Sequence, residues 1–324
     1  MKNDYTKHVE FFNIATDKFN PMKNFKLAFL LLVVPLLSFA WNAGGHSTSG
    51  ALAYTYLKKN NAAVLQKVLT SLQYHPWYHS RWADTLAKTN PDQKDITLFM
   101  LASVWPDEVR RIHEYGGGDK TKWHYINYPF IPENETIQAS APEKINAVEK
   151  LNSLLTELKT QKESEEKAIN LCWLFHILQD LHQPLHTIGL FDANHPTGDR
   201  GGNDTYIKFA DSTKTWVLHS YWDKLVHAEN SGYQSYAQKL LDLRIYKVSK
   251  LSELKSNLKV EDWVKKESWN LAVTKAYLKG TIKGTKENPT IVNIEYNRES
   301  RAIAERRVVL SGIRLAGSLI QIYS

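Results

Sequence analysis

The residues with the clearest chemical potential are two His–Asp pairs that share one spacing. His176 precedes Asp180 by four positions, and His219 precedes Asp223 by four positions. On a helix this spacing places both side chains on one face. A buried ion pair is the ordinary explanation of one such pair, because a buried carboxylate needs a partner. Its repetition on a separate segment favours a metal site.

Three further residues extend this set. His186 comes two positions after Pro184, which ends a helix and lets the chain turn back toward the first pair. Asp107 follows a Trp-Pro dipeptide, and His124 lies between two aromatic residues. Imidazole and carboxylate ligands together suit zinc, whereas calcium and magnesium prefer oxygen ligands alone. The sequence therefore predicts a zinc centre.

The N-terminal segment is typical of an export signal. Residues 22–40 contain two lysines near the start, an apolar run and a small-residue ending, Ser38-Phe39-Ala40. The run is too short to span a bilayer, which needs about 20 apolar residues. Cleavage after Ala40 would give Trp41 a free α-amine that can bind a metal. A buried N-terminal helix is the alternative interpretation.

These boundaries define the expected organisation of the chain. We interpret residues 1–21 as an upstream extension that does not belong to the mature protein, residues 22–40 as the signal peptide and residues 41–324 as one folded domain. The full chain has a formal charge of +7. The leader holds five basic and three acidic residues, so the mature chain keeps about +5. This balance suits an anionic substrate.

The single cysteine, Cys172, excludes an internal disulfide and lies in an apolar run, where we expect a core residue. Apolar residues recur at helical spacing along most of the mature chain. The predicted helices cover residues 47–59, 62–73, 80–88, 93–114, 143–160, 162–183, 231–254, 260–279 and 297–322. Only residues 203–218 alternate like a hairpin. The expected fold is a single, mainly α-helical domain with a small β-hairpin.

At this point the chain closely resembles the zinc-dependent single-strand-specific nucleases and 3′-nucleotidases, in the superfamily of bacterial zinc-dependent phospholipase C. The motifs that carry the resemblance are Trp41-Asn42-Ala43-Gly44-Gly45-His46, Ser103-Val104-Trp105-Pro106-Asp107, Trp123-His124-Tyr125-Ile126-Asn127, His176-x3-Asp180-x5-His186, Gly201-Gly202-Asn203 and His219-x3-Asp223. They span the mature chain in order. The resemblance implies the helical fold of that superfamily.

The resemblance also implies three zinc ions and a ligand set for each. The first zinc would be bound by Asp107, His124, His176 and Asp180, and the second by His186, His219 and Asp223. The third would take the α-amine and carbonyl oxygen of Trp41, His46 and a second oxygen of Asp180. A peptide nitrogen has no lone pair to offer, so signal cleavage would complete the site.

The implied mechanism is attack on phosphorus by a hydroxide shared by two zincs, since zinc lowers the pKa of bound water to about 7. Asp107 would orient or deprotonate that water. Arg110 would neutralise phosphoryl charge, although a solvated surface arginine is an equal alternative. In the family an aromatic residue stacks on the base and a carboxylate two positions later contacts its edge; here these are Tyr125 and Asn127. Asn203 would contact substrate.

Several residues depart from the family pattern or imitate it. Gln179 replaces the usual glycine before the helix aspartate, and Pro106 replaces an alanine. Asp84 lies in a second Trp-Ala-Asp sequence, but we expect a surface or capping role for it. His182 is expected to support the site rather than bind metal. The aromatic group Tyr74, Trp77, Tyr78 and Trp82 is interpreted as a core corner, with a second nucleotide platform as the alternative.

Together these observations predict an exported enzyme that cleaves single-stranded RNA or DNA to 5′-nucleotides and removes 3′-phosphates from nucleotides. We expect a bacterial periplasmic or secreted monomer without stable membrane association. A zinc-dependent phospholipase C is the first alternative. Family lipases usually have glutamate where this chain has Asp223, which favours the nuclease. A noncatalytic zinc-binding protein is the second alternative.

Overall fold

The computed structural model describes residues 41–226, 232–255 and 259–324. The predicted upstream extension and signal peptide, residues 1–40, lie outside the described residues. In the part that is described, no helix combines the length and apolarity needed to cross a membrane. The fold is mainly α-helical, as predicted, with two small sheets.

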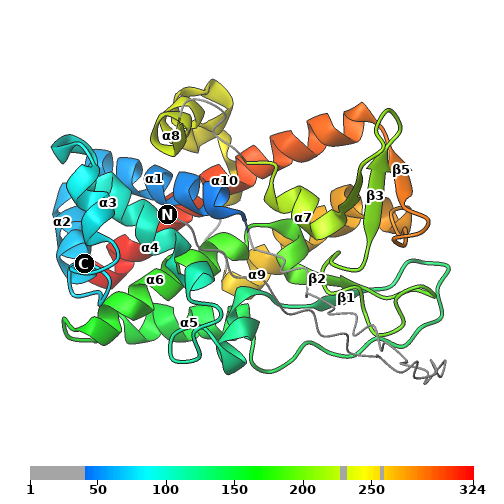
Figure 1. Ribbon diagram of the computed structural model, residues 1–324, viewed down its shortest axis with the longest axis horizontal. Helices are drawn as coiled ribbons and strands as arrows, with labels where there is room; N and C mark the ends of the chain where they lie inside the picture. Colours follow the sequence, from blue (N-terminus) through cyan, green and yellow to red (C-terminus); the bar gives the residue numbers. More distant parts are fainter. Residues whose placement is uncertain (1–40, 227–231, 256–258) are drawn as a thin grey trace, which may run out of the picture. The chain divides into compact units, whose positions relative to one another are not determined.

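Four helices form the centre of the fold (Figure 1). They are α1 (Ala43–Asn60), α4 (Lys94–Glu108), α6 (Glu165–Asp180) and α10 (Ile294–Tyr323). Helix α1 packs against both α4 and α10, and α6 packs against α4 and α10. The contact between α1 and α10 depends on Gly312, since a Cβ there would lie 2.5 Å from Leu52 Cβ. These central helices contribute His46, Asp107, His176 and Asp180.

Shorter helices cover the central ones. They are α2 (Ala62–Leu72), α3 (Ala83–Lys88), α5 (Ala147–Glu157), α7 (Leu218–Asp223), α8 (Gly232–Asp242) and α9 (Val260–Trp263). Single 3₁₀ turns include η1 (Pro91–Gln93), η2 (Gly118–His124), η3 (Pro184–Thr187), η4 (Arg244–Tyr246), η5 (Val248–Lys250), η6 (Ser252–Leu254) and η9 (Leu278–Gly280). Two π-helical stretches, η7 (Val264–Trp269) and η8 (Ala272–Ala276), follow α9.

The sequence of α6 explains its internal position. The Ser164 hydroxyl accepts a hydrogen bond from the Lys167 backbone N–H and so caps the helix. The negative charges of Glu165 and Glu166, in the first turn, interact favourably with the positive end of the helix dipole. From Leu171 onward every residue of the helix is buried. A helix that is buried on all sides lies inside a domain. The polar residues near its end must therefore find partners there.

The predicted hairpin in residues 203–218 is confirmed. Strand β3 (Tyr206–Phe209) pairs antiparallel with β4 (Thr215–Val217), and β5 (Thr290–Val292) adds to β3 in parallel. A second sheet, which the sequence did not predict, pairs β1 (Tyr128–Phe130) in parallel with β2 (Ile188–Leu190). This pair joins the chain just after His124 to the chain just after His186.

Several helices are shorter than predicted. The helix expected over 93–114 ends at Glu108, and the one expected over 162–183 ends at Asp180, four residues before Pro184. Pro184 instead begins the η3 turn, where its missing N–H costs nothing. The stretch predicted as one helix over 260–279 is divided into α9 and the π-helical turns. Apolar spacing alone does not distinguish these wider turns from an α-helix.

Candidate metal centre

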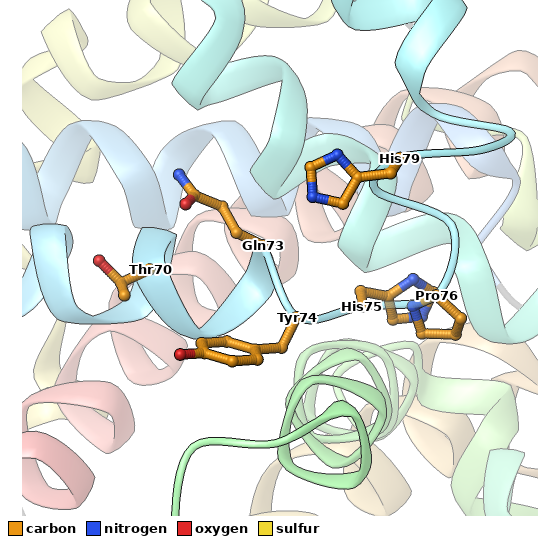
Figure 2. A pocket seen from close by; sticks show the side chains of 6 residues that line it. All are labelled: Thr70, Gln73, Tyr74, His75, Pro76 and His79. Atoms are coloured by element: carbon orange, nitrogen blue, oxygen red, sulfur yellow. The ribbon is translucent and has the colours of Figure 1, made fainter.

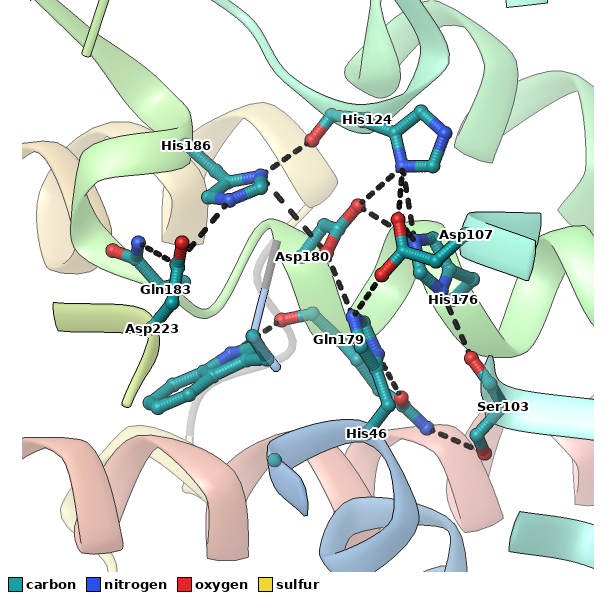
Figure 3. Close-up of polar contacts among 12 residues, drawn as sticks. His46, Ser103, Asp107, His124, His176, Gln179, Asp180, Gln183, His186 and Asp223 are labelled. Atoms are coloured by element: carbon teal, nitrogen blue, oxygen red, sulfur yellow. Dashed lines mark hydrogen bonds and ion pairs between the residues drawn. The ribbon is translucent and has the colours of Figure 1, made fainter. Parts of the chain in front are cut away.

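The predicted side-chain ligands come from six separate elements and meet in one place. Figure 3 labels all of them except His219. They are His46 on α1, Asp107 on α4, His124 at the end of η2, His176 and Asp180 on α6, His186 in η3, and His219 and Asp223 on α7. Their potential ligand atoms form three overlapping groups, within each of which the atoms lie within 4.8 Å of one another: His46, Asp107 and His176; His124, His176 and Asp180; and His186, His219 and Asp223. Below, the first group means His124, His176 and Asp180 together with Asp107, and the second group means His186, His219 and Asp223. Sequence spacing thus identified residues that the fold brings together.

The first group has the dimensions of a tetrahedral zinc site. His176 Nε2 lies 2.9 Å from His124 Nδ1, and both nitrogens lie 3.2 Å from Asp180 Oδ2. Asp107 Oδ1 is 3.6 Å from His176 Nε2 and 3.8 Å from His124 Nδ1. Ligands about 2.1 Å from a tetrahedral zinc lie about 3.4 Å from each other. All five separations are close to that value.

The second group contains three side chains. His186 Nε2 and His219 Nε2 are 3.1 Å apart, and Asp223 places Oδ2 3.6 Å from His219 Nε2 and Oδ1 3.9 Å from His186 Nε2. Burial lowers the pKa of both histidines, that of His219 to about 3, and raises the pKa of Asp223 well above its usual range. Neutral imidazole is the form that binds metal. Three ligands leave a fourth position for water or substrate.

His46 lies beside the first group and contacts the same two carboxylates. Its Nε2 is 3.3 Å from Asp180 Oδ1 and 3.9 Å from Asp107 Oδ2, the oxygens that do not face His124. Each aspartate therefore presents one oxygen to the first group and the other to His46. Carboxylates with this geometry can hold two cations at a short separation. The approach of Asp107 to His46 was not predicted from the sequence.

Backbone carbonyls fix the orientation of three imidazoles. The Nδ1–H group of His176 donates to the Ser103 carbonyl at 2.9 Å. In the same way His186 donates to the His124 carbonyl at 2.7 Å, and His219 donates to the Gly201 carbonyl at 2.6 Å. Since a carbonyl only accepts, each ring carries its proton on Nδ1 and directs the Nε2 lone pair into the site. A hydrogen bond from the other ring nitrogen to a carbonyl is typical of histidines that bind zinc.

Charges within the site also favour cation binding. Burial lowers the pKa of His124 to about 4. Burial acts in the same direction on His176, but the carboxylates of Asp180 and Asp107 outweigh it and raise the pKa of that ring. Burial would raise the pKa of Asp180, yet the neighbouring histidines hold it well below its usual range. Asp180 is thus a carboxylate with no exposed surface, surrounded by imidazoles.

The donor set itself tests whether zinc fits. Five site atoms are buried and have no hydrogen-bond partner: His46 Nε2, Asp107 Oδ1, His124 Nε2, Asp180 Oδ1 and Asp223 Oδ2. Unsatisfied buried polar atoms cost free energy and need an explanation. His124 Nε2 is on the other side of its ring from the Nδ1 that faces the ligands, whereas the remaining four atoms lie where a shared cation would satisfy them. Nitrogen with carboxylate oxygen is the zinc donor set. The residues therefore fit the metal that the sequence predicted.

Comparison with known proteins agrees with this geometry. Residues 41–324 match the family described as S1/P1 Nuclease. The chain belongs to the S1/P1 nuclease family. Endonuclease 4 of Arabidopsis thaliana is 24% identical over 330 residues, which cover 91% of this chain and 94% of that protein. Nuclease S1 of Aspergillus oryzae is 24% identical over 307 residues, covering 89% of this chain and 93% of that protein.

Membership of the S1/P1 nuclease family confirms the resemblance predicted from the ordered motifs and supports a hydrolase with nuclease function. The same comparison includes Endonuclease 3 of Arabidopsis thaliana, 23% identical over 91% of this chain and 94% of that protein. Several groups of histidine and aspartate in the described residues are suited to the metal on which this family depends.

In this S1/P1 nuclease, Trp41 is fully buried against the end of α6. Its indole N–H donates to the Gln179 carbonyl at 3.1 Å, and the Asn42 N–H donates to the Asp223 carbonyl at 3.2 Å. The ring packs on Gly45, where a Cβ would lie 2.7 Å from Trp41 Cβ. These contacts hold the expected first mature residue between the segments that carry Asp180 and Asp223.

The glycines of the Gly-Gly-Asn motif are needed for a close backbone approach next to His219, which the sequence did not predict. Gly201 has φ +65°, and a Cβ there would lie 2.4 Å from the Leu185 carbonyl oxygen. The glycines let the loop pass close enough for Gly201 to accept from His219 Nδ1. Asn203 is half-buried, and its amide donates to the Arg200 carbonyl at 2.8 Å. The motif therefore positions a candidate ligand.

The predicted substrate residues lie at the edge of the centre. Tyr125 and Asn127 are half-buried and line a common pocket of about 170 Å³, together with Phe191 and Thr197. Arg110 is half-buried just beyond the end of α4, and its charge lowers the pKa of several buried site residues, His124 among them. Arg110 is thus not fully solvated, and its role toward the phosphoryl group stays a prediction.

Residues expected to lie outside the centre do so. Asp84 is exposed in the first turn of α3. His182 is buried, but it donates to the Leu178 carbonyl at 2.7 Å and faces Arg314 and Trp263 instead of a candidate ligand. Cys172 is fully buried, as predicted. The expectation that His182 supports the site is therefore wrong: among the described residues its ring contacts no candidate ligand and stabilises the packing of α6 instead.

The aromatic corner is only partly in the core that the sequence favoured, because Tyr74 is exposed and Tyr78 is half-buried. Trp77 and Trp82 are buried, and His75 stacks on Trp82 with ring centroids 4.2 Å apart. A hollow of about 460 Å³ lies outside this stack, and the exposed Tyr74 and His79 lie on its rim (Figure 2). The two tryptophans are thus packed inside the protein, where a base cannot stack on them.

Proposed function

We propose that the chain is an exported, monomeric, three-zinc phosphodiesterase and phosphomonoesterase. It would cleave single-stranded RNA or DNA to 5′-nucleotides and remove 3′-phosphates from nucleotides. The observation that carries this proposal is the shared carboxylates: Asp107 and Asp180 each present one oxygen to the first group and one to His46. Membership of the S1/P1 nuclease family supports the reaction class.

The proposed ligand sets use the first and second groups as they stand and assign His46 to a third zinc. Asp107, His124, His176 and Asp180 would hold the first zinc; His186, His219 and Asp223 the second; His46, Asp180 and the α-amine and carbonyl oxygen of Trp41 the third. The separations of the side-chain ligand atoms, the Nδ1–H tautomers and the burial of Trp41 support these sets.

Zinc bound in this way supplies a Lewis acid for phosphoryl oxygen and lowers the pKa of water to about 7. The protein supplies orientation and charge. Asp107, whose Oδ1 would bind the first zinc, would use its other oxygen to orient the attacking water and accept its proton. Arg110 would pair with the phosphoryl oxygens. No serine or cysteine nucleophile is needed.

Substrate binding is proposed for the pocket beside the centre. The Tyr125 ring would stack on a base, a contact worth about 1–3 kcal/mol. The Asn127 amide offers both a donor and an acceptor to the base edge, where a carboxylate would only accept. Base stacking needs an unpaired base, which explains a preference for single strands. Asn203 would contact the sugar-phosphate on the opposite side, once its amide leaves the Arg200 carbonyl.

The test uses protein that begins at Trp41. Zinc content is measured on the same sample that is assayed with single-stranded RNA and DNA, duplex DNA, 3′-AMP and phosphatidylcholine, before chelation, after it and after zinc is restored. We expect zinc-dependent cleavage of single strands and 3′-AMP. Cleavage of phosphatidylcholine alone would show a phospholipase C, and zinc binding without turnover would show a noncatalytic binding protein.

A second test addresses processing. Protein that carries extra residues ahead of Trp41 has a peptide nitrogen in place of the amine, and we expect it to bind less zinc and to lose activity. Removal of the extra residues by a site-specific protease should restore both. Equal zinc content and turnover before and after trimming would contradict the role of the Trp41 amine.

A further inference from the structure

Gln179 lies at the point where the candidate metal centre meets the N-terminal segment. It precedes Asp180 at the end of α6 and is fully buried. Its side-chain oxygen accepts from His46 Nδ1 at 2.7 Å, and its amide nitrogen donates to Ser103 Oγ at 3.1 Å (Figure 3). Its backbone carbonyl accepts from the Trp41 indole. One residue thus contacts both His46 and Trp41.

The Phe99 carbonyl determines which group donates and which accepts in each of these hydrogen bonds. Ser103 Oγ lies 2.9 Å from the backbone carbonyl of Phe99, which can only accept, so the hydroxyl proton points there. The same oxygen must then accept from the Gln179 NH₂ group. The amide is consequently oriented with its oxygen toward His46, and the His46 ring must carry its proton on Nδ1.

The consequence lies on the other side of the His46 ring. With the proton on Nδ1, the Nε2 lone pair faces Asp180 Oδ1 at 3.3 Å, and both atoms are buried without a hydrogen-bond partner. The other three Nε2 donors of the centre are oriented by backbone carbonyls, which any residue could provide. His46 alone among these four relies on a side chain, so its orientation depends on which residue occupies position 179.

The position of Trp41 depends on the same residue. At the end of α6 the Gln179 carbonyl accepts from the His182 backbone N–H at 3.0 Å, which uses one of the two lone pairs of its oxygen. The second lone pair of the same oxygen accepts from the Trp41 indole N–H at 3.1 Å. The side chain of Gln179 therefore orients His46, while its backbone holds Trp41 nearby.

We propose that Gln179 is a positioning residue that assembles the zinc position shared by His46 and Trp41, through a polar relay that runs from the Phe99 carbonyl through Ser103 and Gln179 to His46. This inference rests on the proposed function for the identity of the metal. It concerns a residue that replaces the usual glycine, so the relay is a property of this chain. Gln179 itself contacts neither metal nor substrate.

The relay is tested with three variants of the protein that begins at Trp41. Gln179→Leu removes the acceptor of His46 and the donor to Ser103 while filling the same space. Gln179→Glu keeps an acceptor toward His46, because a carboxylate accepts from both neighbours. Ser103→Ala leaves Gln179 in place but removes the group that orients its amide, and the Ser103 carbonyl still accepts from His176.

Two measurements read out the relay. Long-range proton–nitrogen NMR correlations of the zinc-free protein report which His46 nitrogen carries the proton, and chelator competition reports the affinity of each zinc. We expect the Nδ1–H form in wild type and Gln179→Glu, and a mixture of both forms in Ser103→Ala. In Gln179→Leu the Nδ1–H form should be lost and one zinc should bind about 10–100-fold more weakly. The affinities for the other zinc ions should stay within about twofold of wild type, whereas general unfolding would weaken all of them.

The possible failures separate the two proposals. Wild-type protein that binds no zinc and cleaves no 3′-nucleotide would overturn the proposed function. If wild type binds zinc and turns over, but Gln179→Leu keeps both the Nδ1–H form and every zinc affinity, the relay is refuted while the function stands. Equal losses in Gln179→Leu and Gln179→Glu would also refute the relay, because the acceptor would then have no influence.

Discussion

Gln183 and Asp223 are joined by a hydrogen bond of 2.8 Å from Gln183 Nε2 to Asp223 Oδ1. The amide oxygen of Gln183 accepts from the Leu185 N–H at 2.6 Å, which fixes the direction of the side chain. The carboxylate of Asp223 is therefore held with Oδ2 toward His219. Sequence reasoning missed this role, because Gln183 was considered only as part of the segment that ends the helix.

Replacement of Gln183 should weaken the second group of ligands. Gln183→Leu removes the donor to Asp223, whose buried carboxylate can then rotate. Partners of metal ligands are typically worth 10–100-fold in affinity, and we expect a loss of about that size for one zinc. Chelator competition measures it. The exposed Gln238, changed to leucine, is the matched control; a similar loss there would show that the effect is not specific.

Removal of a ligand should have a larger effect than removal of its support. His219→Ala deletes one of the three side chains of the second group and should reduce hydrolysis of 3′-AMP by more than about 100-fold, the upper end for supporting residues. Circular dichroism should show the wild-type helical content, since α7 is only one short helix. Turnover near the wild-type level would contradict the assignment of His219.

Much of the fold and of the centre could be predicted from the sequence, because both depend on local spacing. Both His–Asp pairs lie on helices, α6 and α7, as their spacing predicts, and the apolar periodicity marks the other helices. The two-oxygen role of Asp107 could not be predicted, since it depends on where α1 crosses α4. Likewise, the parallel pairing of Tyr128 with Ile188 joins segments that no local pattern connects.

The loop that orients His219 offers a test of backbone geometry. Gly201→Ala places a Cβ 2.4 Å from the Leu185 carbonyl at φ +65°, a conformation that costs about 1–3 kcal/mol for other residues. We expect the free energy of unfolding to fall by at least this amount and the zinc affinity to fall with it. Denaturant titration and chelator competition measure the two effects.

The control for this change lies on α10. Gly317 is helical, and a Cβ there would meet no atom within 4 Å. Gly317→Ala should therefore stabilise the protein by about 0.5–1 kcal/mol, because alanine loses less backbone entropy in a helix. If Gly201→Ala and Gly317→Ala shift the unfolding midpoint in the same direction, the steric explanation for Gly201 is wrong.

The buried His75 predicts how stability depends on pH (Figure 2). Burial lowers its pKa from the ordinary value near 6.5 to about 3. Between these two values the unfolded chain binds a proton that the folded protein refuses, so stability falls as pH falls. Each pH unit in this window costs up to about 1.4 kcal/mol from this residue alone. His75→Phe should remove this residue's contribution to the dependence of the free energy of unfolding on pH.

Denaturant unfolding of zinc-free protein at several pH values between 4 and 7 measures the slope for wild type and His75→Phe. The variant loses the Nδ1 acceptor of the Trp77 N–H, which lowers stability by a similar amount at every pH and leaves the comparison of slopes valid. His79→Phe is the control, because this exposed imidazole stays in water in both states. Parallel curves for wild type and His75→Phe would show that burial of His75 does not exclude its proton.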